Sequence, residues 1–218
     1  MLTPEDGTAA VRLARRALEE GLSDRPTLLS DPVAGTGPLP PVFSQNRGVF
    51  VTLKRYPDHA LRGCIGYPLP VLPLGTAVSR AAVSAATEDY RFRPVRASDL
   101  PRITVEVSVL SVPEPLTFED PEQAIEEVRV GRDGLIVDGL GSSGLLLPQV
   151  GPEQGWSAEQ LLDGTCEKAG LPAGAWRDPR VKVRRFEAEV FTELAPGGDV
   201  VREDPATPTV YGRPGRKT

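Results

Sequence analysis

Hydrophobic and polar residues alternate most regularly at residues 103–110. Every second residue there, beginning with Ile103, is apolar and β-branched, and most of the residues between them are polar. This period of two predicts a strand with one deeply buried face. The β-branched and aromatic residues at 48–54 predict a second strand, and residues 61–67 are expected to be its antiparallel partner across a turn at 56–60.

Further segments along the chain complete the expected sheet. A hairpin is predicted from residues 134–138 and 145–148, which flank a glycine-rich turn at 139–144. A last strand is predicted over residues 181–193.

Capping residues and helical spacing predict four helices. The first follows Thr3 as its N-cap, has Pro4 at the first helical position and ends at Gly21. The same signals predict three more: residues 74–87, a helix capped by Asp120, and a helix from Ser157 to Gly170.

The order of these elements favours an α+β fold. Helices and strands do not alternate regularly and short turns join several strand pairs, so we expect a mainly antiparallel sheet with flanking helices. Residues 23–47 are rich in Pro, Gly, Ser and Asp, which predicts a long connection. We expect a single domain over residues 1–195 and a flexible tail over 196–218, where Pro, Gly and charged residues dominate.

The acidic balance of the chain narrows the classes of partner. The 218 residues suffice for one sizeable core or two lobes, and their net charge of -5 argues against strong non-specific attraction to nucleic acid. The first residues lack the pattern of a secretory signal and no apolar run reaches membrane-spanning length, so we expect a soluble, cytoplasmic protein. Two cysteines and one histidine at unrelated spacings predict no metal site, and no pattern indicates a cofactor.

The strand at residues 61–66 is the leading candidate for chemistry. A period of two places Arg62, Cys64 and Gly66 on one face. A guanidinium close to a thiol favours the thiolate, which is the reactive form of cysteine. Gly63 and Gly66 indicate close approach of a backbone or a ligand. The alternative is an inert, packed cysteine beside an arginine that is tied to a carboxylate.

Polar side chains on neighbouring segments extend this candidate site. Glu106 and Ser108 lie on the polar face of the strand at 103–110, and Lys54 ends the first strand. If these strands pair around Cys64, the polar groups converge on one pocket; the alternative is a structural ion pair.

The charged corner at residues 88–93 is a further candidate for binding. Asp89 and Arg91 lie at a helix end, where Arg91 and Arg93 offer cations for an anionic ligand and Tyr90 offers a ring for stacking. The alternative is a solvated helix terminus that Phe92 anchors.

Seven segments occur in the order typical of one family and cover most of the chain. They are 50–54 (FVTLK), 61–66 (LRGCIG), 88–92 (EDYRF), 105–110 (VEVSVL), 134–137 (GLIV), 144–150 (GLLLPQV) and 166–171 (CEKAGL). The chain thereby resembles the AMMECR-domain family. The resemblance implies an α+β protein with a larger and a smaller lobe, intertwined in one domain, and a cleft near the strand at 61–66. Tyr67 and Tyr90 depart from the residues that many members carry.

The resemblance also implies partners and a class of function. Prokaryotic members are similar to AmmeMemoRadiSam system protein A, which is encoded beside a Memo-like protein and a radical-SAM protein. These two are therefore the expected partners. The family is described as uncharacterised, with suggestions of a role in nucleotide or nucleic-acid modification.

Three functions follow from these observations. The first is an enzyme that acts on a small molecule, nucleotide or base. In it Cys64 is the nucleophile or redox group, Arg62 lowers its pKa or binds an anion, and Glu106 transfers a proton or orients Arg62. The second is a non-catalytic module that binds an anionic ligand, a peptide or a Memo-like partner. The third, nucleic-acid binding, is the weakest because of the acidic net charge.

Overall fold

Antiparallel strands and flanking helices make up the structure, a computed structural model that describes residues 2–23, 38–204 and 206. Contacts divide the chain into two units. Unit 1 contains the residues up to Val109 together with Glu189–Glu203, and unit 2 contains Leu110–Ala188.

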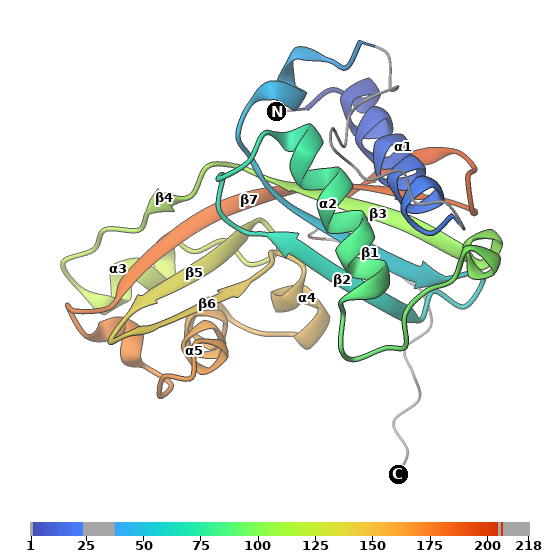
Figure 1. Cartoon of the computed structure of the whole chain (residues 1–218). Coiled ribbons are helices and arrows are strands. Elements are labelled where there is room, and N and C mark those ends of the chain that lie inside the picture. Colours follow the sequence, from blue (N-terminus) through green and yellow to red (C-terminus); the bar gives the residue numbers. More distant parts are fainter. Residues whose placement is uncertain (1, 24–37, 205, 207–218) are drawn as a thin grey trace. The chain divides into compact units, whose positions relative to one another are not determined.

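Unit 1 is a sheet with two long helices on one of its faces (Figure 1). Its elements are α1 (Pro4–Gly21), η1 (Pro41–Ser44), β1 (Gly48–Arg55), β2 (Leu61–Tyr67), α2 (Leu74–Thr87), η2 (Ala97–Arg102), β3 (Ile103–Leu110), the last residues of β7 (Lys182–Glu193) and β8 (Val200–Glu203). The strand order is β2-β1-β3-β7, and β8 pairs with β7. β1 and β2 are antiparallel, as predicted.

Small side chains let the helices of unit 1 pack closely on the sheet. The buried face of α2 is largely alanine, and Val49, Val51 and Leu53 of β1 belong to the same core. Gly63 of β2 makes the closest approach, because a Cβ atom there would lie 2.1 Å from the carbonyl oxygen of Ala85. Only glycine therefore allows α2 to lie directly on β2.

Unit 2 has its own sheet and its own core. Its elements are β4 (Glu114–Pro115), α3 (Pro121–Glu127), β5 (Asp133–Gly139), β6 (Ser142–Leu146), α4 (Val150–Gln154), α5 (Ala158–Lys168), η3 (Ala175–Arg177) and the first residues of β7. The strand order is β7-β5-β6, and β4 pairs with β7. Trp176 and Cys166, both completely or almost completely buried, lie in the core of this unit.

The predicted α+β class and antiparallel sheet are confirmed. The predicted starts of α1 and α5 are also confirmed, since Thr3 and Ser157 each form a capping box with the residue three positions later. Asp120 caps α3 but accepts its hydrogen bond from the backbone of Glu122. The hairpin turn is shorter than predicted, because β5 and β6 continue until only Leu140 and Gly141 remain between them.

Two segments expected to lack regular structure have a different outcome. Strand β8 lies within the segment that was expected to be a tail, where it pairs with the end of β7. Most of the predicted connection at 23–47 and the end of the tail lie outside the described residues. The cleft near residues 61–66 stays a prediction.

Candidate functional site

The face of the unit 1 sheet opposite α2 carries a group of polar side chains. Because Val51 and Leu53 face the helices, alternation turns Thr52 and Lys54 to the other side of β1. Thr52 is directly opposite Cys64 in the ladder with β2. Together with two residues of β3, they form what we call the polar face: Thr52, Lys54, Cys64, Glu106 and Ser108.

An ion pair lies at the centre of the polar face. The Nζ of Lys54 donates to Oε2 of Glu106 at 2.5 Å. The Glu106 side chain is 7% exposed, whereas that of Lys54 is 21% exposed. The pair is therefore shielded on the carboxylate side and reaches solvent on the ammonium side. The structure brings together these two residues that the sequence singled out.

Ser108, two residues beyond Glu106 on the same strand, is buried and unsatisfied. Its residue exposure is 1%, and within the described part of the chain its Oγ has no hydrogen-bond partner. A buried hydroxyl without a partner costs about 1–3 kcal/mol. An unsatisfied buried group of this kind calls for an explanation, and a ligand that bonds to it is one.

The surroundings of Cys64 favour the neutral thiol. Burial raises the pKa of Cys64 above its ordinary value, and the nearby Glu106 carboxylate also raises it. The Thr52 hydroxyl donates to Sγ at 3.4 Å, and this bond and the charge of Arg91 lower the pKa less than burial raises it. The net shift is opposite in direction to the one that the sequence led us to expect.

The hydrogen bonds of the Arg62 guanidinium go to backbone carbonyl oxygens and not to the thiol. Nη1 donates to the carbonyl oxygen of Arg93 at 2.7 Å and Nη2 to that of Pro94 at 3.4 Å. The register bears on the predicted shared face of Arg62 and Cys64: Leu53 pairs with Gly63 but Lys54 pairs with Leu61, so Arg62 has no partner in β1. A β-bulge of this kind breaks the alternation on which the shared face of Arg62 and Cys64 was inferred.

Asp89 and Arg91 hold the corner after α2 in place. Both oxygens of the buried Asp89 accept from the Arg91 guanidinium, at 2.9 and 2.7 Å, and Oδ2 also accepts from the backbone N–H of Cys64 at 2.8 Å. The hydrogen bonds from Arg91, followed by those from the backbone, hold the pKa of Asp89 far below its usual range. These contacts tie the corner to β2, which is a structural role.

The two glycines of the motif serve packing. Gly63 accommodates α2, and a Cβ atom on Gly66 would lie 2.5 Å from the Phe50 ring and 2.3 Å from the backbone of β1. Neither glycine faces an open space that a ligand could fill. Thr52 was missed by the sequence analysis, although its place between Phe50 and Lys54 already assigned it to this face.

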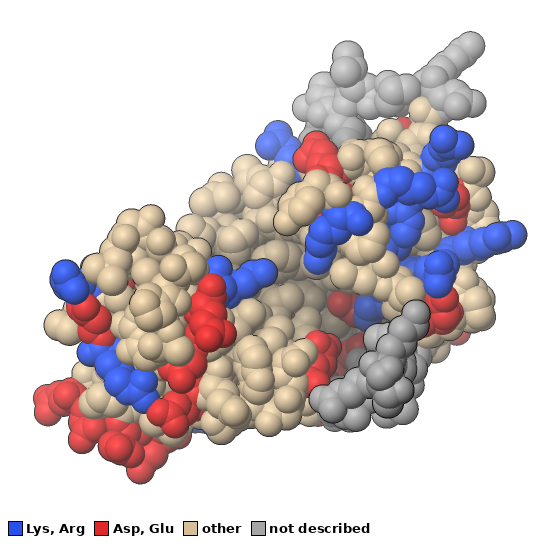
Figure 2. Space-filling view, turned by 90° about the horizontal axis from the view of Figure 1, so that it is seen from below, with Lys and Arg blue, Asp and Glu red and all other residues tan. Residues whose placement is uncertain are grey.

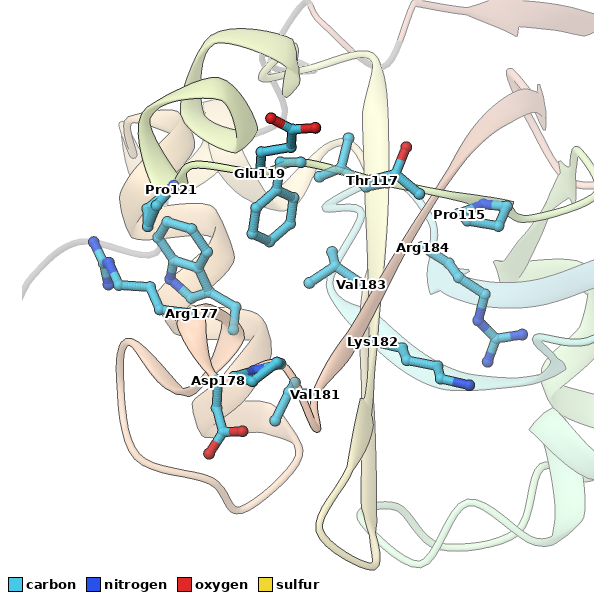
Figure 3. Close-up of a pocket in the computed structure, with 14 residues that line it drawn as sticks. Pro115, Thr117, Glu119, Pro121, Arg177, Asp178, Val181, Lys182, Val183 and Arg184 are labelled. Atoms are coloured by element: carbon cyan, nitrogen blue, oxygen red, sulfur yellow. The ribbon is translucent and has the colours of Figure 1, made fainter.

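Unit 2 contains a pocket that the sequence did not indicate. Its volume is 740 Å³, and its wall includes the rings of Phe118 and Trp176 as well as Val183. Figure 3 shows the charged groups of Arg177 and Asp178 directed away from Val183 of β7. The lining residues come from two distant segments, 115–121 and 176–184, and neither carries a recognisable pattern.

Searches for metal clusters and membrane spans gave no candidates over the described ranges. No group of three or more His, Cys, Asp or Glu side chains in them could hold a metal ion. Likewise, no helix among these residues combines the length and the apolar character needed to cross a membrane.

Comparison with known proteins gives the family. A family model described as AMMECR1 matches residues 11–191 of the chain. The chain belongs to the AMMECR1 family. Among AMMECR1 relatives, the protein MJ0810 of Methanocaldococcus jannaschii is 45% identical over 93% of this chain and 98% of its own length. A protein of Thermococcus gammatolerans is 51% identical over 91% of this chain and 96% of its own length.

A solved structure shares the AMMECR1 fold. The crystal structure of the uncharacterized protein PH0010 from Pyrococcus horikoshii matches with a TM-score of 0.80 and 45% sequence identity. The match covers 93% of this chain and 98% of that one. It therefore extends through both units of the AMMECR1 chain, while the chemistry has to be argued from the residues themselves.

Proposed function

We propose that this AMMECR1 protein binds a small, uncharged polar molecule on its polar face. The observation that carries the proposal is the buried, unpartnered hydroxyl of Ser108 two residues from the Lys54–Glu106 ion pair. A hydroxyl, an ammonium and a carboxylate on one face are donors and acceptors of hydrogen bonds, and a ligand would have to displace neighbouring side chains to reach the buried hydroxyl. The partial exposure of Lys54 and Cys64 gives that ligand access from solvent.

The charge of the face favours a neutral ligand. Lys54 and Glu106 form a pair with no net charge, so an ionised ligand would add an uncompensated charge next to a largely buried carboxylate. An uncharged group with adjacent donors and acceptors can bond to both members of the pair. Primary amides and the edges of nucleobases have this arrangement, and they are the class of ligand that we propose.

Cys64 lines the proposed site as an uncharged thiol. Because burial raises the pKa of its thiol, few thiolates form near neutral pH. An enzymatic function with Cys64 as the nucleophile therefore has less support than a binding function. The expected Memo-like and radical-SAM partners stay a hypothesis that concerns the same protein but not this site.

The proposal can be tested by nuclear magnetic resonance on the isotope-labelled full chain. Adenosine, cytidine, uridine and acetamide are titrated as probes, and we expect at least one nucleoside to shift the backbone signals of residues 54, 106 and 108. Loss of a hydrogen bond to a charged group weakens binding by about tenfold or more, so Lys54→Met should show this loss. Lys168→Met, which removes an exposed lysine of unit 2, is the matched control and should bind like the wild type.

Two results would contradict the proposal. One is the absence of any shift at the polar face with all four probes. The other is equal affinity of Lys54→Met and Lys168→Met for a probe that does bind. A Cys64→Ala variant is expected to keep its affinity within about threefold, because a neutral thiol is a weak hydrogen-bonding group.

A further inference from the structure

A pocket of unit 1 is lined mostly by arginine. It has a volume of 250 Å³ and lies where β1 ends, β2 begins and η2 meets β3. The residues that line it are Arg55, Arg62, Arg93, Asp99, Arg102 and Ile103. Figure 2 shows lysine and arginine side chains gathered at this end of unit 1, to the right in the view.

Acidic groups compensate only part of this charge. Arg55 is paired with Asp58 through hydrogen bonds that include one of 2.9 Å from Nε. Arg93 is 3.7 Å from Asp99, and Asp99 also accepts the backbone N–H of Arg96. Four guanidinium groups thus meet two carboxylates, in a protein whose net charge is -5.

Among the described residues, the two remaining arginines have no acidic partner. Arg62 donates only to the carbonyl oxygens of Arg93 and Pro94. Arg102 forms no ion pair or side-chain hydrogen bond with any residue that the structure describes. The pocket therefore has an excess of two positive charges. Both belong to guanidinium groups, which can bind an anion through two parallel N–H groups.

Arg62 is also fixed in advance. Its two hydrogen bonds to carbonyl oxygens hold the guanidinium in position, and the bulge in β2 sets the direction of the side chain. A cation that is already ordered loses little conformational entropy when an anion binds. This arrangement differs from that of a solvated surface arginine, which has to be immobilised on binding.

We propose that this pocket binds the phosphate group of a small phosphate monoester. A phosphate monoester carries a charge of about -1.5 to -2 at pH 7, which matches the excess of two cations, and its three free oxygens suit several guanidinium groups. The volume of the pocket lies below the roughly 300 Å³ at which pockets for drug-sized ligands begin. The pocket therefore holds a phosphate and little more of the ligand. The site is separate from the polar face, which is proposed for uncharged ligands.

The experiment is isothermal titration calorimetry on the full chain at low ionic strength. The probes are glycerol 3-phosphate as a monoester, inorganic phosphate as the free anion, and dimethyl phosphate as a diester of the kind found in nucleic acids. We expect the monoester to bind at least tenfold more tightly than the diester, because the diester carries one charge and two free oxygens. Tighter binding of the diester than of the monoester would overturn the assignment in favour of a nucleic-acid backbone.

Variants connect the binding to the pocket. Arg102→Gln and Arg62→Gln should each weaken binding of the monoester by about tenfold or more, since each removes charge-assisted hydrogen bonds. Arg80→Gln, an exposed arginine of α2, is the matched control and should leave affinity unchanged. Asp99→Asn removes a competing carboxylate and should strengthen binding, an effect that misfolding cannot produce.

The pH dependence provides an independent measurement. The second ionisation of a phosphate monoester has a pKa of about 6, so binding should strengthen between about pH 5 and pH 8 while the arginines stay charged. Sulfate, which is a dianion throughout this range, should show no such change. Absence of monoester binding at low ionic strength, or equal affinities for Arg102→Gln and Arg80→Gln, would overturn the proposal.

Discussion

Unit 1 holds two buried ion pairs on opposite faces of one sheet. On the helix-covered face, Arg15 of α1 donates from Nε to Glu193 of β7 at 2.8 Å and from Nη2 to the carbonyl oxygen of Ile103 at 2.6 Å. Glu193 also accepts the backbone N–H of Val105 at 3.1 Å. On the other face, Lys54 pairs with Glu106 beside a buried hydroxyl that lacks a partner.

The difference between the pairs distinguishes structure from function. Removing two charges from water is costly unless hydrogen bonds satisfy the groups around them. Around Glu193 both carboxylate oxygens accept hydrogen bonds from within the chain, so the Arg15–Glu193 pair is satisfied without a ligand. On the polar face the chain leaves Ser108 unsatisfied and keeps Lys54 partly exposed. The Arg15–Glu193 pair is therefore suited to holding α1 against the sheet, and the Lys54–Glu106 pair is suited to a binding site.

The largest effect on stability is expected from breaking the Arg15–Glu193 ion pair. Glu193→Ala leaves the buried Arg15 cation without its partner and should reduce the free energy of unfolding by about 3–5 kcal/mol. Glu127→Ala, which breaks a half-exposed pair with Arg185, should cost at most about 1 kcal/mol. Urea denaturation of both variants measures the difference, and similar losses would show that the burial of the Arg15–Glu193 pair does not raise the cost of breaking it.

A smaller effect of opposite sign is expected at the unsatisfied hydroxyl. Ser108→Ala removes a buried polar atom that has no partner and should leave stability unchanged or raise it by up to about 1 kcal/mol. Ser79→Ala, at a buried serine of α2 whose polar groups are engaged, should lower stability by about 0.5–1.5 kcal/mol. A loss of stability in Ser108→Ala equal to that in Ser79→Ala would remove the reason for placing a ligand at Ser108.

The smallest expected effect is a change in the reactivity of Cys64. Because burial raises its pKa, the rate of alkylation by iodoacetamide should be low at neutral pH and should rise only above the free-thiol pKa of about 8.5. Glu106→Gln removes a nearby negative charge, so it should move this rise to lower pH. Following the rate against pH in a Cys166→Ala background isolates the signal, and a rise below pH 8 in the parent would contradict the neutral thiol.

Local patterns in the sequence predicted the parts of the fold that depend on neighbouring residues. Alternation at 103–110 located Glu106 and Ser108 on one face, and the cap at Thr3 located the start of α1. The position of Arg62 was beyond such reasoning, because a bulge is defined by the register of the partner strand. A period of two cannot show where the ladder gains a residue.

Contacts between distant residues explain the other omissions. Arg15 lies among the small apolar residues of the buried face of α1, which was a visible anomaly, but its partner is 178 residues away and follows no local pattern. The arginine pocket likewise joins β1, β2 and η2, whose charged residues look like ordinary solvated ends when each segment is considered alone. Tertiary packing decides which of these charges meet.

The shared use of β7 has a consequence for synthesis of the protein. Lys182–Ala188 belong to unit 2 and Glu189–Glu193 to unit 1, so the sheets of both units lack a strand until β7 has been translated. Until then, the nascent β3 can pair with β1 but not with β7, and its unpaired edge is a site for wrong pairing. Native folding of both halves therefore waits for translation of almost the whole chain, and a chain that terminates before β7 leaves both halves open to aggregation and proteolysis.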